Sequence, residues 1–382
     1  MRVYYSTNEN AIAINWLNPA QTASQTLSYM YTECQDIHCR SVAPMQDTPA
    51  IKMPYQAEVR VVNTGYVVRM SANSTGNSTT SDKAYRVFTF KQDIPIPSYL
   101  IAFSIGNLTE EQLGRRTFVL SEPTNIKNDT KELSDLENIL DTMESYLNPP
   151  NPYEWGTYAI IVQPPSFPIG GMENPLLTFA SPTIIVGDKS QVYVATHEIG
   201  HSWTGNQVTC RDWSNFWLNE GFTVFLERKV SGIIHGTEFS LVNSQLGNSS
   251  LWSDIYGYGI TNSYSSLFPD LSDGANADDS SSEVPYEKGF QFLYYLENNV
   301  MKTQKDFQLM LGYYVNKYRG KSVTYLDFRL TFNEWLTQNY SPEDAQHAIN
   351  MVDWNAWVLA PGGNPVQLNF TTVNATIFAN LA

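Results

Sequence analysis

The run His197-Glu198-Ile199-Gly200-His201 constrains this chain more than any other feature, because it predicts a metal site on a helix. Residues four apart lie on one face of an α-helix, so His197 and His201 can present their imidazoles to one ion. Glu198 follows His197 directly, and its carboxylate can reach a water on that ion without serving as a ligand. The flanking residues are largely apolar, which is typical of a buried helix.

A third ligand is available at Glu220, nineteen residues after His201. The largely apolar segment 213–227 predicts a second helix there, in which a carboxylate is costly unless it is paired or bound to a cation. Two imidazoles and one carboxylate leave the fourth position of a tetrahedral zinc ion open for water, as in catalytic sites. Zinc lowers the pKa of that water towards about 7, so Glu198 could take its proton near neutral pH.

The alternative is a helix with two buried, hydrogen-bonded histidines and no metal. The chain has only five histidines, and two of them stand at ligand spacing, which favours zinc. We therefore expect one Zn²⁺ ion, with His197, His201 and Glu220 as its ligands. Glu198 is then the expected general base.

Two further motifs accompany the histidine motif. They are Gly170-Gly171-Met172-Glu173-Asn174 upstream and Val284-Pro285-Tyr286-Glu287-Lys288-Gly289 downstream. Together the three motifs resemble those of the M1 (gluzincin) aminopeptidases, and the likeness extends over nearly the whole chain. A likeness to the branch of that family that hydrolyses a leukotriene epoxide lies in three short runs, residues 46–49, 165–168 and 352–357.

This resemblance implies an α+β protein in which a saddle-like antiparallel β domain precedes a thermolysin-like catalytic domain, with an α-helical domain last. Residues 1–108 then form a partial N-terminal β domain, residues 109–360 the catalytic domain, and residues 361–382 a linker or the stub of an absent helical domain. On this expectation the β domain lacks its early strands and exposes sheet edges. The absent helical domain would otherwise contribute basic residues that bind a substrate carboxylate.

Local patterns agree with a β-rich beginning. Alternating apolar and polar residues at 57–61, 66–70 and 85–90 predict half-exposed antiparallel strands. The stretch 71–82 is polar and rich in Gly, Ser and Thr, and it predicts a hairpin loop.

A helical pattern follows. Apolar residues at helical spacing from Leu133 to Leu147 predict a helix with Thr130 as its N-cap. The prolines at 149, 150 and 152 should end this helix. Residues 158–162 then predict a buried strand that leads to the Gly-Gly motif.

Composition excludes some classes of function. The net charge of −15 argues against nucleic-acid binding and supplies no polybasic membrane anchor; it reflects either an acidic surface or a preference for cationic ligands. Cys34, Cys39 and Cys210 are too few for a disulfide framework. The chain starts without a secretion signal and has no apolar stretch long enough to span a bilayer, so we expect a cytoplasmic protein. The oligomeric state is left open.

The resemblance assigns further residues to the zinc site. Tyr286 corresponds to the tyrosine that stabilises the anion formed at the tetrahedral carbon; aromatic packing is its alternative role. Glu173 corresponds to the anchor for the α-ammonium group of the substrate, with Gln35 in the same pocket. Such an anchor explains exopeptidase behaviour, because a charged amine must pair with it. The other residues expected to line the substrate site are Cys34, Pro168, Ile169 and Met172.

Gly170 and Gly171 carry no side chains, so an extended peptide can lie against their backbone in the manner of an added strand. For a Gly-Gly pair alone, an ordinary turn would be the alternative. The Met-Glu-Asn that follows the pair favours the peptide-binding role.

Some positions depart from the leukotriene-hydrolysing branch. Glu33 and Asp36 flank Gln35 where that branch has uncharged residues. Two extra carboxylates should favour basic or amino-bearing substrates and disfavour an anionic lipid, unless they only form a solvated loop face. Asp278 matches by spacing an aspartate that helps to place a hydroxyl on the lipid, but neighbouring acidic residues allow an alignment shifted by one. Ser281 stands where that branch has a second tyrosine.

We therefore expect a zinc metallo-aminopeptidase that hydrolyses N-terminal residues from short peptides with a free N-terminus. The first alternative is an epoxide hydrolase acting on leukotriene A4 or a similar lipid, and the substitutions at Glu33, Asp36 and Ser281 speak against it. The second alternative is a truncated zinc-binding fragment with weak catalysis or none.

Overall fold

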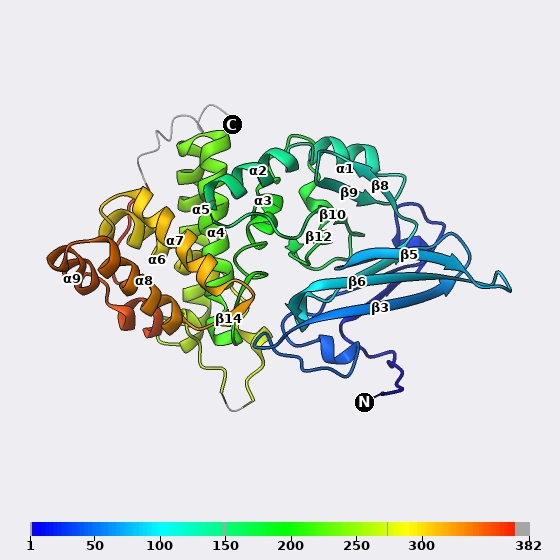
Figure 1. Cartoon of the computed structure of the whole chain (residues 1–382), viewed down its shortest axis with the longest axis horizontal. Helices are drawn as coiled ribbons and strands as arrows, with labels where there is room; N and C mark the ends of the chain where they lie inside the picture. Colours follow the sequence, from blue (N-terminus) through cyan, green and yellow to red (C-terminus); the bar gives the residue numbers. More distant parts are fainter. Residues whose placement is uncertain (1, 148–149, 273, 371–382) are drawn as a thin grey trace. The chain divides into compact units, whose positions relative to one another are not determined.

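The computed structural model describes residues 2–147, 150–272 and 274–370, and their contacts divide the chain into two compact units (Figure 1). Unit 1 comprises Met1–Leu140, Tyr153–Ser202 and Gly320–Ser322, and unit 2 comprises Asp141–Pro152, Trp203–Arg319 and Val323–Ala382. Within the predicted C-terminal stub, residues 371–382 lie outside the described residues, as does the predicted helix breaker Pro149. The predicted domain boundaries at residues 108 and 360 stay predictions.

Unit 1 begins with two antiparallel sheets. The first has the order β1-β2-β7-β4, formed by β1 (Ile14–Leu17), β2 (Tyr29–Thr32), β7 (Phe103–Gly106) and β4 (Val67–Met70). The second has the order β3-β6-β5, formed by β3 (Lys52–Val62), β6 (Tyr85–Pro97) and β5 (Asn73–Thr79). The strands predicted at 57–61 and 85–90 therefore lie within β3 and β6, and the strand predicted at 66–70 coincides with β4 except for its first residue.

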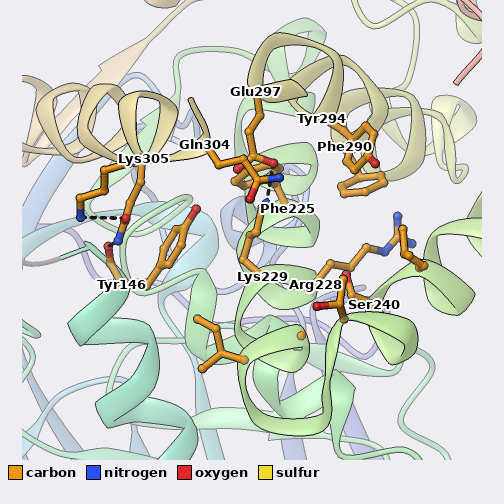
Figure 2. Close-up of a pocket in the computed structure, with 15 residues that line it drawn as sticks. Tyr146, Phe225, Arg228, Lys229, Ser240, Phe290, Tyr294, Glu297, Gln304 and Lys305 are labelled. Atoms are coloured by element: carbon orange, nitrogen blue, oxygen red, sulfur yellow. Dashed lines mark hydrogen bonds and ion pairs between the residues drawn. The ribbon is translucent and has the colours of Figure 1, made fainter. Parts of the chain in front are cut away.

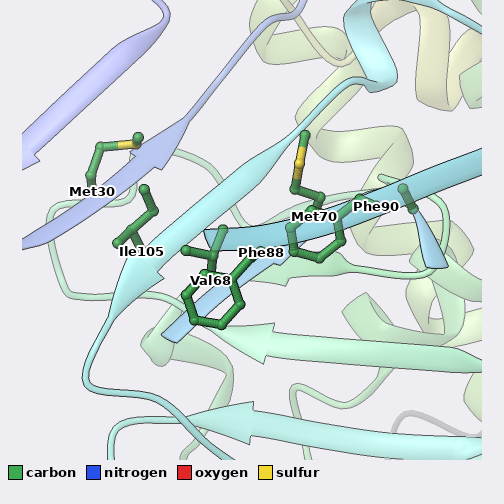
Figure 3. Packing of buried hydrophobic residues seen from close by; sticks show 7 residues of the cluster. Met30, Val68, Met70, Phe88, Phe90 and Ile105 are labelled. Carbon is green, nitrogen blue, oxygen red and sulfur yellow. The ribbon is translucent and has the colours of Figure 1, made fainter. Parts of the chain in front are cut away.

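One hydrophobic cluster joins these two sheets. Figure 3 shows Met30, Val68, Met70 and Ile105 from the four-stranded sheet packed with Phe88 and Phe90 of β6. Alternate residues of a strand face the same side of a sheet, so the period-two pattern of these strands places their apolar side chains in this shared core.

The hairpin loop predicted at 71–82 is wrong, because residues 73–79 form β5. All seven residues of β5 are exposed, so no apolar alternation marks the strand in the sequence. The strand forms through backbone pairing with β6, and a register shift between Ser74 and Gly76 interrupts the ladder. Its existence depends on the tertiary partner rather than on its own composition.

The third sheet of unit 1 is mixed, with the order β11-β12-β10-β9-β8. Its central strands β9 (Thr117–Ser121), β10 (Tyr158–Val162) and β12 (Thr178–Ala180) are parallel, while the edge strands β8 (Thr109–Gln112) and β11 (Gly171–Met172) are antiparallel. All five residues of β10 are buried, as the predicted apolar strand at 158–162 requires. After β12 the chain reaches α3 (Tyr193–Gly200).

The helix predicted to start after Thr130 is divided in two. The chain forms α1 (Ile126–Glu132) and then α2 (Leu136–Leu147). Thr130 is therefore not an N-cap but lies inside α1, where its hydroxyl donates to the carbonyl oxygen of Ile126 at 2.6 Å. Serine and threonine hydroxyls make this bond to the carbonyl four residues back in helices, so the side chain alone does not identify the position as a cap.

Unit 2 is mainly helical. Its helices are α4 (Trp217–His235), α5 (Thr237–Tyr258), α6 (Gly289–Tyr295), α7 (Gln304–Tyr318), α8 (Tyr325–Asn339) and α9 (Pro342–Asn350). Among the described residues, the π-helical turns Val284–Lys288 and Leu296–Val300 precede and follow α6, and the turn Asn355–Leu359 comes after α9. The short strands are β13 (Val208–Cys210) and β14 (Lys321–Val323), the latter at the sequence boundary between the units.

Short 3₁₀ turns complete the secondary structure. They are Pro19–Gln21, Cys39–Ser41, Ser98–Leu100, Pro182–Ile184, Trp213–Asn215, Ser263–Ser265 and Ala277–Ser280. Within the described part of the chain, no helix is both long and apolar enough to cross a membrane.

Aromatic rings form the core of unit 2. Trp217 of α4 contacts Phe292 and Phe328 at centroid distances of 5.7 and 6.1 Å, and Phe222 stacks on Tyr314 at 5.2 Å. Rings at these distances bury large apolar areas and favour tilted or edge-on pairs. The amino-terminal half of α4 is therefore held rigidly by the helices packed around it.

A buried lysine links separate segments of unit 2 through hydrogen bonds. Lys288 is fully buried, and its ammonium group donates to the carbonyl oxygens of Ser265, Ala360 and Gly362 at 3.1, 3.0 and 2.8 Å. Burial lowers the pKa of Lys288 to about 8, so the group is still mainly protonated at neutral pH. Its three donors thereby join two loops that are far apart in the sequence to the turn Val284–Lys288.

Replacing Lys288 by methionine should lower the free energy of unfolding by about 2 kcal/mol or more, because three buried carbonyl oxygens lose their donor. Urea unfolding at neutral pH measures this difference. Lys305→Met, at an exposed position of α7, is the control and should change stability by less than about 0.5 kcal/mol. Equal losses in the two variants would contradict the proposed role of Lys288.

Candidate active site

The two motif histidines lie together on one side of α3. His197 is in the last turn of this helix, and His201 is its C-cap, with its backbone amide bonded to the carbonyl of His197. The two Nε2 atoms are 3.0 Å apart, and the ring centroids are 4.7 Å apart. His201 is buried, with only 2% of its surface exposed. The predicted i, i+4 arrangement of the imidazoles is therefore present.

Glu220 completes a set of possible metal ligands. It lies in the first turn of α4, and one of its carboxylate oxygens lies within 4.8 Å of a ring nitrogen of each histidine. A tetrahedral zinc ion with bonds of about 2.0–2.2 Å separates its ligand atoms by roughly 3.4 Å. The spacing of these donors, two imidazole nitrogens and one carboxylate oxygen, fits such an ion. The three residues form a cluster that could bind a metal.

A second group adjoins the first and shares His201. Carboxylate oxygens of Glu173 and Glu198 and a ring nitrogen of His201 all lie within 4.8 Å of one another. Glu198 comes from α3, whereas Glu173 follows β11, and the two side chains are 5% and 4% exposed. Burying two carboxylates close together costs free energy that a nearby cation offsets.

The loop after β2 adds a third carboxyl to this region. The Glu33 amide donates to the carbonyl of Ala13, and Glu33 Oε1 accepts from the amide of Gln35, both at 2.9 Å. Burial raises the pKa of Glu33 to about 8, the Gln35 amide opposes this shift, and the negative charges of Glu173 and Asp36 add to it. The structure therefore brings Glu33 near the predicted ammonium anchor.

Cys34, between Glu33 and Gln35, contributes a neutral thiol. A hydrogen bond with Cys39, followed by burial, holds the pKa of the Cys34 thiol well above its ordinary value. The two cysteines pack with Ala13 in a small hydrophobic cluster. At this position Cys34 behaves as a small apolar side chain.

The segment before β11 carries the next predicted residues. Pro168 and Ile169 are exposed, while the neighbouring Phe167 is buried edge-on against Tyr31 and Phe179 at 5.6 and 5.9 Å. The carbonyl of Gly170 accepts from the Ser181 amide at 2.9 Å.

Strand β11 then pairs with β12, with Gly171 opposite Ala180 and the buried Met172 opposite Phe179. These bonds fix the Gly-Gly segment at the edge of the mixed sheet.

Tyr286 lies in the π-helical turn Val284–Lys288 of unit 2, partly buried, with its ring edge-on to Phe216 at 6.1 Å. The neighbouring Glu287 holds this turn in place through a buried, two-pronged ion pair with Arg228 of α4, at 2.9 and 2.5 Å. A methyl group added at Gly247 of α5 would overlap the Glu287 carboxylate, so this glycine makes room for it. Bidentate pairs of this kind impose strict geometry.

Close packing fixes the other end of the turn. A methyl group on Gly221 would lie 2.7 Å from the Cα atom of Gly289, so only glycine allows α4 to approach α6 this closely. Arg228 and Phe290 also line a cavity of about 360 Å³ within unit 2. Figure 2 shows Lys229 in the lining of this cavity joined to Glu297, at 2.5 Å.

Asp278 lies in unit 2. It is exposed on the turn Ala277–Ser280 and accepts a hydrogen bond from the Asn276 amide group at 3.2 Å. Among the described residues it belongs to neither metal-binding group. Its predicted role in placing a lipid hydroxyl stays a prediction.

One site feature was not predicted from the sequence. It is the ion pair that holds the tyrosine-bearing turn, which joins Arg228 to Glu287 across 59 residues of chain. The grouping of Glu173 with Glu198 and His201 was expected, but only from the family resemblance. A sequence motif identifies which residue types are present, but it does not give the distances between motifs in the folded protein. Only the co-occurrence of the motifs indicated that Glu173 belongs with the residues of the histidine motif.

Glu33→Gln should alter how thermal stability depends on pH. An ordinary glutamate has a pKa of 4.5, whereas Glu33 in the folded protein keeps its proton up to a pKa of about 8. The bound proton therefore stabilises the folded state fully below pH 4.5. This contribution to stability is lost as the pH rises towards 8. The Tm of the wild type should therefore fall relative to Glu33→Gln across this window. Thermal unfolding measured across it, with the exposed Glu58→Gln as control, tests the expectation; a constant Tm difference would contradict it.

The sequence matches family models and related proteins whose descriptions agree with a metallopeptidase site. A model of the Peptidase family M1 domain matches residues 131–357, and a model of the Peptidase M1 N-terminal domain matches residues 10–100. Leukotriene A-4 hydrolase of Xenopus laevis is 40% identical over 375 residues, covering 97% of this chain and 59% of that protein. Leucine aminopeptidase 2 of Aspergillus terreus is 38% identical over 381 residues, covering 98% of this chain and 59% of that protein. This chain thus spans about three-fifths of the length of these relatives.

Solved structures give the same result. Yeast LTA4 hydrolase in complex with bestatin matches with a TM-score of 0.89 and 34% identity, covering 98% of this chain and 57% of that chain. The α+β class is confirmed, with a β-rich N-terminal domain ahead of the peptidase domain. The resemblance found in the three motifs is confirmed as well, and the chain belongs to peptidase family M1, a family of zinc metallopeptidases.

Proposed function

We propose that this chain acts as a zinc metallo-aminopeptidase that removes N-terminal residues from short peptides. The observation that carries the proposal is the grouping of His197, His201 and Glu220, with Glu198 and Glu173 adjoining them. The first three supply a complete ligand set for one zinc ion, and the other two supply a base and an anchor. The family relationship supports the same function, because its relatives include proteins named leucine aminopeptidase 2.

When bound, zinc supplies a Lewis acid for the scissile carbonyl and lowers the pKa of a water molecule at the site. Glu198 is the general base: it takes the proton of the attacking water and delivers it to the leaving amine. Its burial beside His201 keeps the carboxylate in a low-dielectric setting where its charge acts strongly. Tyr286 donates its phenolic hydrogen to the anionic oxygen that develops at the tetrahedral carbon.

Glu173 selects a free amino terminus. Its buried carboxylate accepts the α-ammonium group of the substrate, which places the first peptide bond beside Glu198. Gln35 assists at the same amine end. Glu33, next to Glu173, keeps its proton up to a pKa of about 8 and is therefore mainly uncharged at neutral pH. A basic or amino-bearing first residue is favoured only where its positive charge lies close enough to lower the pKa of Glu33 again. Cys34 and the segment from Pro168 to Met172 line the path of the peptide.

A runner-up function is hydrolysis of a leukotriene-type epoxide, favoured by the likeness to proteins named leukotriene A-4 hydrolase. Offering the purified chain both a panel of aminoacyl amides and the lipid epoxide, with zinc and after chelation, separates the two. Zinc-dependent release of amino acids supports the proposal. Turnover of the epoxide alone supports the runner-up, and bound zinc without either turnover indicates a non-catalytic zinc-binding fragment.

Glu198→Gln should lower kcat for aminoacyl amides by on the order of 10²–10⁴-fold, because the amide cannot accept the proton of the attacking water. Zinc content, measured by elemental analysis, should stay at one ion per chain, since Glu198 is not one of the three ligands. His201→Ala is the matched comparison and should lose the metal together with the activity. Undiminished turnover in Glu198→Gln would remove it from the role of base.

Glu173→Gln should act on recognition of the amino terminus. Loss of a charged hydrogen bond to the substrate ammonium should reduce kcat/KM for free-amine substrates by roughly 10–100-fold. The preference for these over N-acetylated analogues should shrink by a similar factor. Steady-state kinetics with both substrate types measures this, and an unchanged preference would argue against the anchor.

The remaining expectations are proposals of the same kind. They comprise the saddle-like and thermolysin-like subclasses of the two domains, their boundaries at residues 108 and 360, and a cytoplasmic location. Peptide substrates are the expected partners, and no nucleic acid or membrane partner is proposed.

A further inference from the structure

Two buried threonine hydroxyls join the segments that carry the proposed metal ligands. Thr204 follows α3, Thr223 lies in α4, and the two residues are 1% and 0% exposed. Their Oγ1 atoms are 2.7 Å apart, and Thr223 Oγ1 also donates to the backbone carbonyl oxygen of Thr204 at 2.9 Å. The side chain of Thr223 therefore contacts both the hydroxyl and the backbone of Thr204.

Each threonine stands three residues after a proposed ligand, Thr204 after His201 and Thr223 after Glu220. Residues three apart lie on one side of a helix, so Glu220 and Thr223 share a face of α4. Three residues of chain span at most about 10 Å, so His201 cannot lie far from Thr204. The hydrogen bonds between the threonines therefore limit how far His201 and Glu220 can separate.

The loop around Thr204 is closed by its own hydrogen bonds. The Gly205 amide donates to the carbonyl of Val208 at 2.7 Å, and the Val208 amide donates to the carbonyl of Trp203 at 3.1 Å. Trp203 is fully buried, and its indole donates to the carbonyl of Asn151 at 3.0 Å. Thr204 thus faces α4 from a fixed loop, so a change in its contact with Thr223 is not absorbed by slack in the chain.

A hydrogen bond lets two oxygens approach more closely than a methyl group and an oxygen can. O–H···O bonds join atoms about 2.5–3.0 Å apart, whereas a carbon and an oxygen in contact stay about 3.3 Å or more apart. A methyl group in place of the Thr223 hydroxyl would therefore separate the two segments by about 0.5 Å. Metal–ligand distances are met within about 0.2 Å in a functional site, so this separation exceeds the tolerance.

We propose that Thr204 and Thr223 are positioning residues: their hydrogen bonds set the distance between His201 and Glu220 and thereby the affinity of the site for zinc. The inference rests on the proposed zinc aminopeptidase function and adds to it two residues that are not among the three ligands. Residues that hold metal ligands in place change metal affinity by about 10–100-fold when their contacts are lost.

Competition with a chelator measures the zinc affinity of the wild type, Thr223→Val and Thr223→Ser. Thr223→Val removes the hydroxyl at nearly constant volume and should raise the Kd for zinc by about 10–100-fold. Thr223→Ser keeps the hydroxyl and should stay within about threefold of the wild type. Equal affinities of the wild type and Thr223→Val would overturn the proposal, and so would an equal loss in both variants.

Thr331→Val separates positioning from general stability. Thr331 of α8 is fully buried, and its hydroxyl donates to the phenolic oxygen of Tyr318 at 3.0 Å. Thr331→Val should lower the Tm of the zinc-free protein, as Thr223→Val does, because both lose a buried hydrogen bond. Its Kd for zinc should nevertheless stay within about threefold of the wild type. A loss of affinity equal to that of Thr223→Val would show that affinity follows stability alone and would overturn the proposal.

Cobalt(II) bound in place of zinc reports the ligand geometry without any activity. Its visible absorption bands depend on the arrangement of the ligands, so Thr223→Val should shift or weaken them and Thr223→Ser should not. An unchanged spectrum in Thr223→Val would overturn the proposal. If Thr223→Val does not fold, Thr204→Ala removes the other hydroxyl without adding bulk. It should raise the Kd for zinc by at least about threefold, and an unchanged Kd would overturn the proposal.

These measurements are independent of peptide hydrolysis. If the wild type binds zinc but releases no amino acids, the proposed function fails, while the affinities of the variants still decide the inference. An active wild type whose zinc affinity is the same in Thr223→Val rejects only the inference.

Discussion

The active-site region is defined by several carboxylates that are buried close together and shielded from water. Glu173, Glu198 and Glu220 are each at most 5% exposed, and each lies within 4.8 Å of His201 in one of the two metal-binding groups. Carboxylates are desolvated at considerable cost, and a positive charge brought close offsets that cost. Both proposed ligands, a divalent ion and a substrate ammonium group, are cations. The same electrostatic demand is therefore consistent with both the proposed cofactor and the proposed preference for a free amino end.

Supporting charges in unit 2 act through fixed geometry rather than through contact with substrate. The Arg228–Glu287 pair and the three carbonyl bonds of Lys288 hold consecutive residues of one turn from different directions. Tyr286 precedes them directly in that turn, so its backbone has little freedom to move. Such preorganisation suits the proposed role of Tyr286, because a donor that is already in place needs no reorganisation when the anion forms.

Features governed by local sequence were predictable. The buried strand at 158–162 and the histidine helix follow from apolar runs and i, i+4 spacing, which are properties of a single segment. Strand β5 and the break between α1 and α2 were missed, because an exposed strand owes its existence to its partner and a threonine hydroxyl can serve either a cap or a helix interior. The hydrogen bond between Thr204 and Thr223 joins two segments across 19 residues of chain, and no local pattern encodes such a contact.

The exposed strand β5 has a consequence for the surface of unit 1. It stands at the end of the order β3-β6-β5, and a terminal strand can template the growth of a sheet from one molecule into another. Its composition of Asn, Ser, Thr and Gly, together with the irregularity near Gly76, makes it a poor template. The polar side chains of this segment thus protect against fibril formation. Substitutions to valine or isoleucine there would turn an inert edge strand into one that pairs with copies of itself.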